Sequence, residues 1–231
     1  MRTLVVVLWC VSSVVWAAEK PAEKPAEKGK AAEAAPKYAA LTPEQILALA
    51  KTGDAKVGAA GYEVCAGCHL PTGAGRPDGA FPQLAGQHPV VLVKQLADMR
   101  AGVRDNPVMH PFAIALTDAK LADVSAYIAT LPVPHDNGLG RGDTLAVGMK
   151  LYERDCKSCH GGRGEGDAAK LYPVLAGQHY KYLLRQATDI RDGKRRNANP
   201  DMVKVIARYT DKEIDTVVDY MSRLNMPKPK P

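Results

Sequence analysis

The sequence has few of the large apolar rings that usually fill a protein core. Of its 231 residues, two are tryptophan and two are phenylalanine. Both tryptophans, Trp9 and Trp16, lie within the first 16 positions, so Phe81 and Phe112 are the only wholly apolar rings in the rest of the chain. Such rings dominate the energetics of most cores. Another bulky apolar group is therefore expected to complete the core.

The composition otherwise excludes several classes of protein. The chain is 46% apolar and 24% charged, with 20 glycines and 17 prolines. These values are ordinary for a globular protein and rule out a collagen-like, fully disordered or polytopic membrane chain. The length is compatible with one or two domains.

The N-terminus predicts export. Arg2 precedes an apolar run from Leu4 to Trp16, and small residues stand one and three positions before the expected cleavage point. The run is shorter than the ~20 apolar residues of a membrane-spanning helix. We therefore interpret residues 1–17 as a cleaved signal peptide rather than an uncleaved anchor, which places the mature protein in the periplasm. Residues 18–38 repeat Ala, Glu, Lys and Pro and predict a flexible tether without an apolar face.

Beyond this tether the chain is duplicated. Order is expected to resume at Thr42–Gln45, which matches a capping box with proline at the first helical position. The motif Leu-Ala-Gly-Gln-His at 84–88 recurs at 175–179, an offset of 91 residues. After a two-residue insertion the offset becomes 93, as between Met109 and Met202. Two copies are too few for a solenoid and indicate a duplicated domain.

Each copy is predicted to be all-α. An apolar series with helical spacing begins at Leu121 and recurs 93 residues later at Ile214. No stretch alternates as a half-buried strand would. The turn-forming segment 132–138 separates the copies, so the predicted domains span 39–133 and 134–231.

The cysteines carry the chemical signal. One of the five, Cys10, lies in the predicted signal peptide. The other four belong to two Cys-x-x-Cys-His motifs: Cys65, Cys68 and His69, and Cys156, Cys159 and His160. This motif attaches c-type haem, its thiols bonding the vinyl groups and its histidine facing the iron as an axial ligand. Half of a zinc site and a redox dithiol are the alternatives. The adjacent histidine, the repetition in register and the export signal favour two covalently attached haem c groups, which would supply the missing core.

The second axial ligand decides whether each iron is closed to other chemistry. Met109 and Met202 are the one methionine pair at equivalent positions, and each follows Asn-Pro in a polar loop. His88 and His179 are also equivalent, so bis-histidine ligation is the alternative. We prefer Met109 and Met202, because His/Met ligation is the known c-type pattern. His88 and His179 are then expected to be exposed residues at the start of a helix.

These motifs resemble the dihaem cytochrome c4 family, which is a class I cytochrome c in duplicate. The resemblance covers about Gly53 to Asn225. It implies two tandem class I cytochrome c domains, each wrapped around one haem, with the carbonyls of Pro82 and Pro173 facing the axial histidines. It also implies a close crossing of the first and last helix in each domain, at Gly58 with Tyr62 and at Gly148 with Tyr152.

The expected function is electron transport in a respiratory chain, with one electron carried per haem. Similar proteins pass electrons from a quinol-oxidising complex or a dehydrogenase to a terminal oxidase. No catalytic constellation repeats between the copies, so no catalytic residue is assigned. One alternative is a dihaem electron-transfer subunit of a dehydrogenase complex. The other, less favoured, is a dihaem oxidoreductase such as a peroxidase or a thiosulfate-oxidising cytochrome.

The distribution of charged residues along the chain bears on which partner proteins it could bind. The C-terminal copy, from residue 136, carries 18 lysines and arginines against 13 carboxylates. Five basic residues of this copy are of interest: the run Lys194-Arg195-Arg196, together with Arg185 and Arg191. They are expected either to attract an acidic redox partner by long-range electrostatics or simply to be solvated. A further possibility is that Arg195 contacts a haem propionate. Nucleic acid is not an expected partner. Docking to a membrane complex and the oligomeric state are left open.

Overall fold

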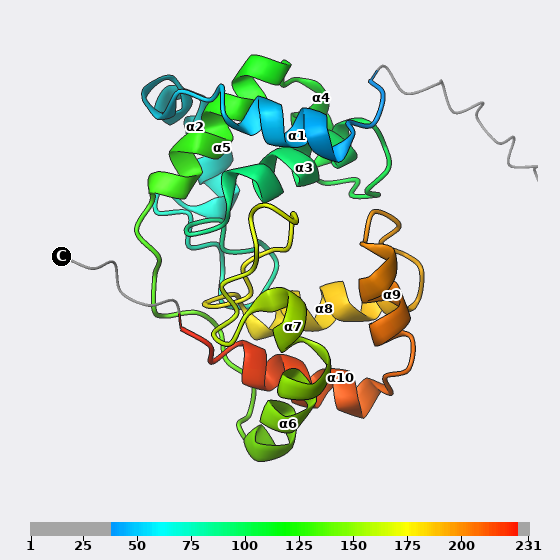
Figure 1. Cartoon of the computed structure of the whole chain (residues 1–231). Helices are drawn as coiled ribbons and strands as arrows, with labels where there is room; N and C mark the ends of the chain where they lie inside the picture. Colours follow the sequence, from blue (N-terminus) through cyan, green and yellow to red (C-terminus); the bar gives the residue numbers. More distant parts are fainter. Residues whose placement is uncertain (1–37, 226–231) are drawn as a thin grey trace, which may run out of the picture. The chain divides into compact units, whose positions relative to one another are not determined.

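The regular structure is helical. The computed structural model describes residues 38–225 (Figure 1). The predicted signal peptide, residues 1–17, and the predicted tether before residue 38 lie outside these described residues. Within them the only extended pairing is an isolated bridge between Asp167 and Tyr172. None of the helices there combines the length and hydropathy that crossing a bilayer requires. The predicted all-α class is confirmed.

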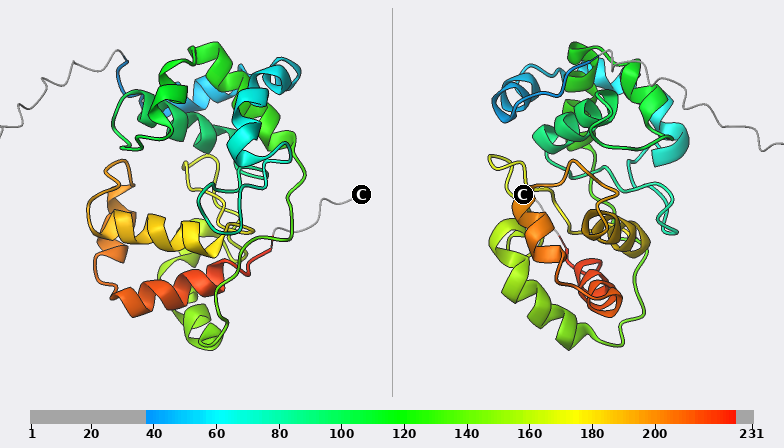
Figure 2. Two further views of the ribbon diagram at one scale, coloured as in Figure 1. Left: turned by 180° about the vertical axis from the view of Figure 1, so that it is seen from behind. Right: turned by 90° about the vertical axis from the view of Figure 1, so that its right-hand side faces the viewer.

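The helices form two sets that follow the duplicated sequence (Figure 1, Figure 2). The N-terminal half contains α1 (Pro43–Ala50), α2 (Ala55–His69), α3 (Pro89–Arg100), α4 (His110–Ile114) and α5 (Asp118–Thr130). The C-terminal half contains α6 (Leu145–Asp155), α7 (Lys157–His160), α8 (Tyr180–Arg191), α9 (Pro200–Ile206) and α10 (Asp211–Met221). The domain limits 39–133 and 134–231 stay a prediction.

Each half is built on a close crossing of its first long helix over its last. At the α2–α5 crossing, a Cβ placed on Gly58 would lie 2.0 Å from the carbonyl oxygen of Asp123. At the α6–α10 crossing, a Cβ on Gly148 would lie 2.5 Å from the carbonyl oxygen of Thr216. Only a residue without a side chain allows backbones to approach so closely. The expected role of the two glycines is confirmed.

The Cys-x-x-Cys-His motif is connected to the preceding helix differently in the two halves. Two residues separate Tyr62 from Cys65, whereas three separate Tyr152 from Cys156. One extra residue rotates a helix by about 100°. Helix α2 runs without interruption to the end of its motif, whereas α6 ends at Asp155 and the short α7 begins after it. This break compensates for the extra residue, so that both motifs reach equivalent positions.

Helix α1 belongs to the N-terminal half alone. Its predicted capping box is present, with the Thr42 N–H donating to Gln45 Oε1 at 2.8 Å and the Gln45 N–H donating to Thr42 Oγ1 at 3.3 Å. Ile46, which is 2% exposed, packs with Val93 and Leu121 against α3 and α5. The residues 91 positions further on, 134–141, form no helix. The N-terminal half therefore gains a small apolar cluster that its counterpart lacks.

Candidate haem sites

The histidine of each Cys-x-x-Cys-His motif is buried and held by a proline carbonyl. His69 Nδ1 lies 3.0 Å from the carbonyl oxygen of Pro82, and His160 Nδ1 lies 3.0 Å from that of Pro173. Because a carbonyl oxygen only accepts, each Nδ1 carries the proton and each Nε2 has a free lone pair. Burial lowers the pKa of both histidines, which favours the neutral ring that a metal requires. The proline carbonyls stand where the resemblance places them.

A tyrosine in each half fixes the turn that follows the motif. Leu70 directly follows α2 and has a φ of 66°, which is unusual for a residue other than glycine, and Gly161 directly follows α7. The Tyr62 hydroxyl donates to the Leu70 carbonyl at 2.9 Å, and the Tyr152 hydroxyl donates to the Gly161 carbonyl at 2.7 Å. These bonds satisfy carbonyls that the helix ends leave without a partner. The orientation of each buried histidine is thereby tied to the helix that carries its motif.

The expectation that both methionines lie in a loop is confirmed for Met109 and wrong for Met202. Met109 stands immediately before α4, and its N–H donates to the Asn106 side chain at 3.2 Å. Met202 lies inside α9, which begins at Pro200 and is capped by Asn199. Both methionines are partly buried. Met99 and Met221 are buried instead, as expected for residues that fill the core.

All eight residues predicted to hold the two haems line one cavity of about 1370 Å³. They are Cys65, Cys68, His69, Met109, Cys156, Cys159, His160 and Met202. The four cysteines are free thiols. A cavity with two free thiols, a fixed neutral histidine and a methionine in each half suits a covalently attached porphyrin in each.

The protonation of the thiols separates haem attachment from redox-dithiol chemistry. Burial raises the pKa of Cys65 and raises that of Cys156 to about 12. A reactive Cys-x-x-Cys pair needs the opposite shift, because the thiolate is its nucleophile. The redox-dithiol alternative is therefore disfavoured.

Two arginines that line the same cavity form hydrogen bonds to neutral side chains. Arg104 and Arg195 donate to the side-chain oxygens of Gln95 and Gln186, at 2.8 to 3.2 Å. Within the described residues neither guanidinium has a carboxylate within 4.0 Å. Burial, followed by the like charge of Arg104, lowers the pKa of Arg195 to about 10, so Arg195 stays charged at neutral pH. A buried cation with only neutral acceptors is costly. The carboxylates of a haem would supply the missing negative charge.

The expectation that His88 and His179 are exposed is wrong. His179 is 2% exposed, and its Nε2 donates to the Ala74 carbonyl at 2.8 Å. His88 Nε2 donates to the Glu165 carbonyl at 2.9 Å. In both cases the acceptor lies in the opposite half. These histidines connect the halves and are absent from the cavity lining.

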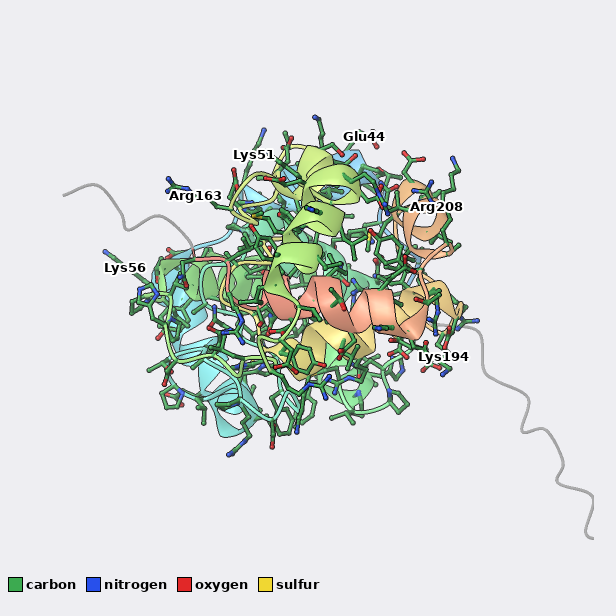
Figure 3. All side chains as sticks on the ribbon, turned by 90° about the horizontal axis from the view of Figure 1, so that it is seen from below. Glu44, Lys51, Lys56, Arg163, Lys194 and Arg208 are labelled. Carbon is green, nitrogen blue, oxygen red and sulfur yellow. The ribbon has the colours of Figure 1, made fainter. Side chains whose placement is uncertain are left out.

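The basic run of the C-terminal half is only partly a surface feature. Arg195 points into the shared polar network, and Arg185 Nη2 donates to the Gly79 carbonyl of the N-terminal half at 2.8 Å. Arg191 pairs with Asp192 and Asp211. Lys194 lies at the periphery, where Figure 3 places it, and Arg196 is exposed. The exposed members of the run are therefore Arg185, Lys194 and Arg196, whereas Arg191 and Arg195 are partly buried.

Four glutamines occupy equivalent positions in the two copies, and no role was assigned to any of them from the sequence alone. Gln87 and Gln178 belong to the duplicated Leu-Ala-Gly-Gln-His segment, and each bonds the backbone of the opposite half. Gln95 and Gln186 accept from both arginines. The signal in the sequence that could have indicated these roles is that each glutamine recurs at the equivalent position of the other copy.

Comparison with known proteins agrees with this geometry. The cytochrome c family model matches residues 55–132 and 145–225. The chain is 37% identical over 170 residues to the thiosulfate dehydrogenase electron acceptor of Stutzerimonas stutzeri, covering 69% of this chain and 78% of that protein. It is 35% identical over 181 residues to cytochrome c4 of Pseudomonas aeruginosa, covering 75% of this chain and 90% of that protein.

The fold is similar to that of a solved relative. The crystal structure of reduced recombinant cytochrome c4 from Pseudomonas stutzeri matches with a TM-score of 0.67 and 31% identity, covering 75% of this chain and all of that one. The chain therefore belongs to the cytochrome c family. Within that family it is a dihaem class I cytochrome c of the cytochrome c4 type, as the sequence motifs predicted. It carries two covalently bound haem c groups, one for each cytochrome c domain.

Proposed function

We propose that this dihaem cytochrome is an exported electron carrier of the periplasm, with residues 1–17 removed as a signal peptide and domains spanning 39–133 and 134–231. It takes electrons from a quinol-oxidising complex or a dehydrogenase and passes them to a terminal oxidase, without itself catalysing a reaction. The covalent attachments are Cys65 and Cys68 in one domain and Cys156 and Cys159 in the other. The axial pairs are His69 with Met109 and His160 with Met202.

One observation carries this proposal: a fixed histidine and a partly buried methionine line the same cavity in each half. When bound, each haem supplies an iron that gains or loses one electron. The chain's own residues hold the neutral histidine with its Nε2 free and offer a thioether as sixth ligand. They also bury both histidines. Two closed axial positions leave no site for substrate, which is the arrangement of a carrier.

The methionine ligands are tested by replacing each one with leucine. Met109→Leu and Met202→Leu should each abolish half of the far-red charge-transfer absorption of methionine-ligated ferric haem. Each should also lower the reduction potential of one haem only, because methionine ligation raises the potential. Optical spectra and potentiometric titration measure both effects.

Two core methionines serve as matched controls for these variants. Met99→Leu and Met221→Leu remove buried thioethers at other places in the same two halves and should leave the far-red absorption whole. Full absorption in Met109→Leu or Met202→Leu would contradict the assignment. Bis-histidine ligation would show itself as the lack of this absorption in the unaltered protein.

A second candidate role follows from one relative. The protein of Stutzerimonas stutzeri that is 37% identical to this chain is described as the electron acceptor of a thiosulfate dehydrogenase. We propose that this chain accepts electrons from a dehydrogenase of that kind, as a separate carrier or as a bound subunit.

This role is tested by following haem reduction after mixing with thiosulfate. We expect reduction when both thiosulfate and a purified thiosulfate dehydrogenase are present, and no reduction with thiosulfate alone. Reduction by thiosulfate alone would instead make this chain the oxidising enzyme. No reduction in either mixture, while a quinol-oxidising complex reduces it, would leave only the first role.

A further inference from the structure

Two equivalent glutamines each form two hydrogen bonds to the backbone of one residue in the opposite half. Gln87 Nε2 donates to the Val174 carbonyl at 3.1 Å, and the Val174 N–H donates back to Gln87 Oε1 at 3.0 Å. Gln178 Nε2 donates to the Gln83 carbonyl at 2.9 Å, and the Gln83 N–H donates to Gln178 Oε1 at 3.0 Å. Gln83 and Val174 are equivalent residues, 91 positions apart. The two contacts are therefore reciprocal copies of one arrangement.

The orientation of each glutamine amide is fixed by a further bond. The N–H of His88 donates to Gln87 Oε1 at 3.1 Å, and the N–H of His179 donates to Gln178 Oε1 at 3.1 Å. Each Oε1 thus accepts two backbone N–H groups. Since only the oxygen of the amide can accept, the Nε2 group must face the carbonyl of the other half.

The backbone N–H groups that bind the glutamines belong to the same peptide units as the two proline carbonyls. The N–H of Val174 and the carbonyl of Pro173 are the two ends of one peptide unit, and that carbonyl accepts from His160 at 3.0 Å. The N–H of Gln83 and the carbonyl of Pro82 form the same unit beside His69. A continuous path therefore runs from each glutamine oxygen, through one peptide unit, to the histidine of the opposite half.

Such a path transmits polarisation. A peptide whose N–H donates a hydrogen bond carries more negative charge on its carbonyl oxygen, so successive bonds strengthen one another. A stronger acceptor draws the Nδ1 proton of the histidine and makes the ring a more basic ligand. A more basic axial ligand stabilises ferric over ferrous iron and lowers the reduction potential.

We infer that Gln178 is a positioning residue for His69 and Gln87 a positioning residue for His160, so that each half lowers the reduction potential of the haem held by the other. This inference rests on the proposed function, in which both histidines are axial ligands. It goes beyond that function by assigning a cross-domain control of potential to two residues that do not touch iron.

The test is a pair of crossed variants in the full-length holoprotein. Methionine approximates the shape of glutamine and forms neither bond. Gln87→Met should raise the potential of the C-terminal haem and leave the N-terminal haem unchanged, and Gln178→Met should do the reverse. The expected size is roughly a threefold change in the redox equilibrium, or about 30 mV when tenfold is 59 mV for one electron. Redox titration followed by NMR, with each haem identified by contacts to its own motif, measures the two potentials separately.

A matched control separates this effect from general weakening between the halves. His88→Phe removes the 2.9 Å bond to the Glu165 carbonyl, which also joins the halves but does not involve the Pro173–Val174 peptide. It should leave both potentials unchanged. Equal shifts of both haems in Gln87→Met, a shift of the N-terminal haem alone, or no shift would each overturn the inference.

A measurement on the unaltered protein keeps the inference testable if a variant does not fold. In the reduced, diamagnetic protein, scalar coupling should be detectable between the Val174 amide nitrogen and the side-chain carbonyl carbon of Gln87. Its absence would contradict the proposed path. The same spectra report whether His160 is an axial ligand. A protein without that ligation would refute the proposed function, whereas axial ligation with unmoved potentials would refute this inference alone.

Discussion

Replacing Cys65 and Cys68 by alanine is expected to leave the N-terminal half unfolded while the C-terminal half folds around its own haem. A domain of this size is marginal on apolar burial alone. The N-terminal half contains two separate clusters of four buried hydrophobic residues each. Leu92, Val124 and Ile128 of one cluster line the haem cavity, and the other cluster reaches the cavity through partly buried residues such as Leu96 and Leu116. Without haem these small clusters would face an open space. Haem content should fall by half, and hydrogen exchange should lose its protection in α2, α3 and α5.

The mirror variant, Cys156→Ala with Cys159→Ala, serves as the control. The C-terminal half contains one cluster of fifteen buried hydrophobic residues, including Ile214 and Val217 of α10. We expect it to retain more helix without its haem than the N-terminal half does. Circular dichroism and limited proteolysis measure the difference. An N-terminal half that stays helical and protease-resistant without haem would show that its core is sufficient alone.

The second large effect is expected at the crossing of α2 over α5. Gly58→Ala places a Cβ 2.0 Å from the Asp123 carbonyl oxygen and 2.9 Å from the Cβ of Tyr127. Both neighbours sit on a packed helix, so the crossing must open. We expect a loss of about 3 kcal/mol in the free energy of unfolding, at the upper end for overpacking. Denaturant titration measures it as a lower midpoint.

Gly61→Ala is the matched control for this change. Gly61 lies one turn further along the same helix, and a Cβ there would meet nothing within 4 Å. The substitution should raise stability by up to about 1 kcal/mol, because alanine favours helix over glycine. Equal effects of the two substitutions would mean that helix propensity, rather than the close crossing, governs Gly58.

The predictions that succeeded depend on signals within a few residues. The capping box at Thr42–Gln45 forms, and the proline carbonyls lie 3.0 Å from the histidines 13 residues before them. Glycine at two helical positions correctly indicated two close crossings. In each case the local spacing, or the family pattern that contains it, is enough to specify the contact.

The predictions that failed concern residues whose partners lie in the other copy. His88 and His179 looked like surface residues at a helix start, but their acceptors are 77 and 105 positions away in the sequence. Arg195 was interpreted as part of a surface run or as a contact to a haem propionate, and neither interpretation included its hydrogen bond to Gln95, 100 positions away. No local pattern distinguishes a polar side chain that meets solvent from one that meets a second domain.

The sequence alone therefore specified an all-α duplicated cytochrome with two covalently bound haems, because attachment, helical periodicity and duplication are all encoded in short spacings. Only the tertiary structure decided that the repeated glutamines and histidines reach across to the other half. Such contacts depend on how the two copies pack, since a hydrogen bond requires atoms to meet in space rather than at a fixed separation along the chain. The link from Gln87 to His160 became visible only once the Pro173–Val174 peptide was seen between them.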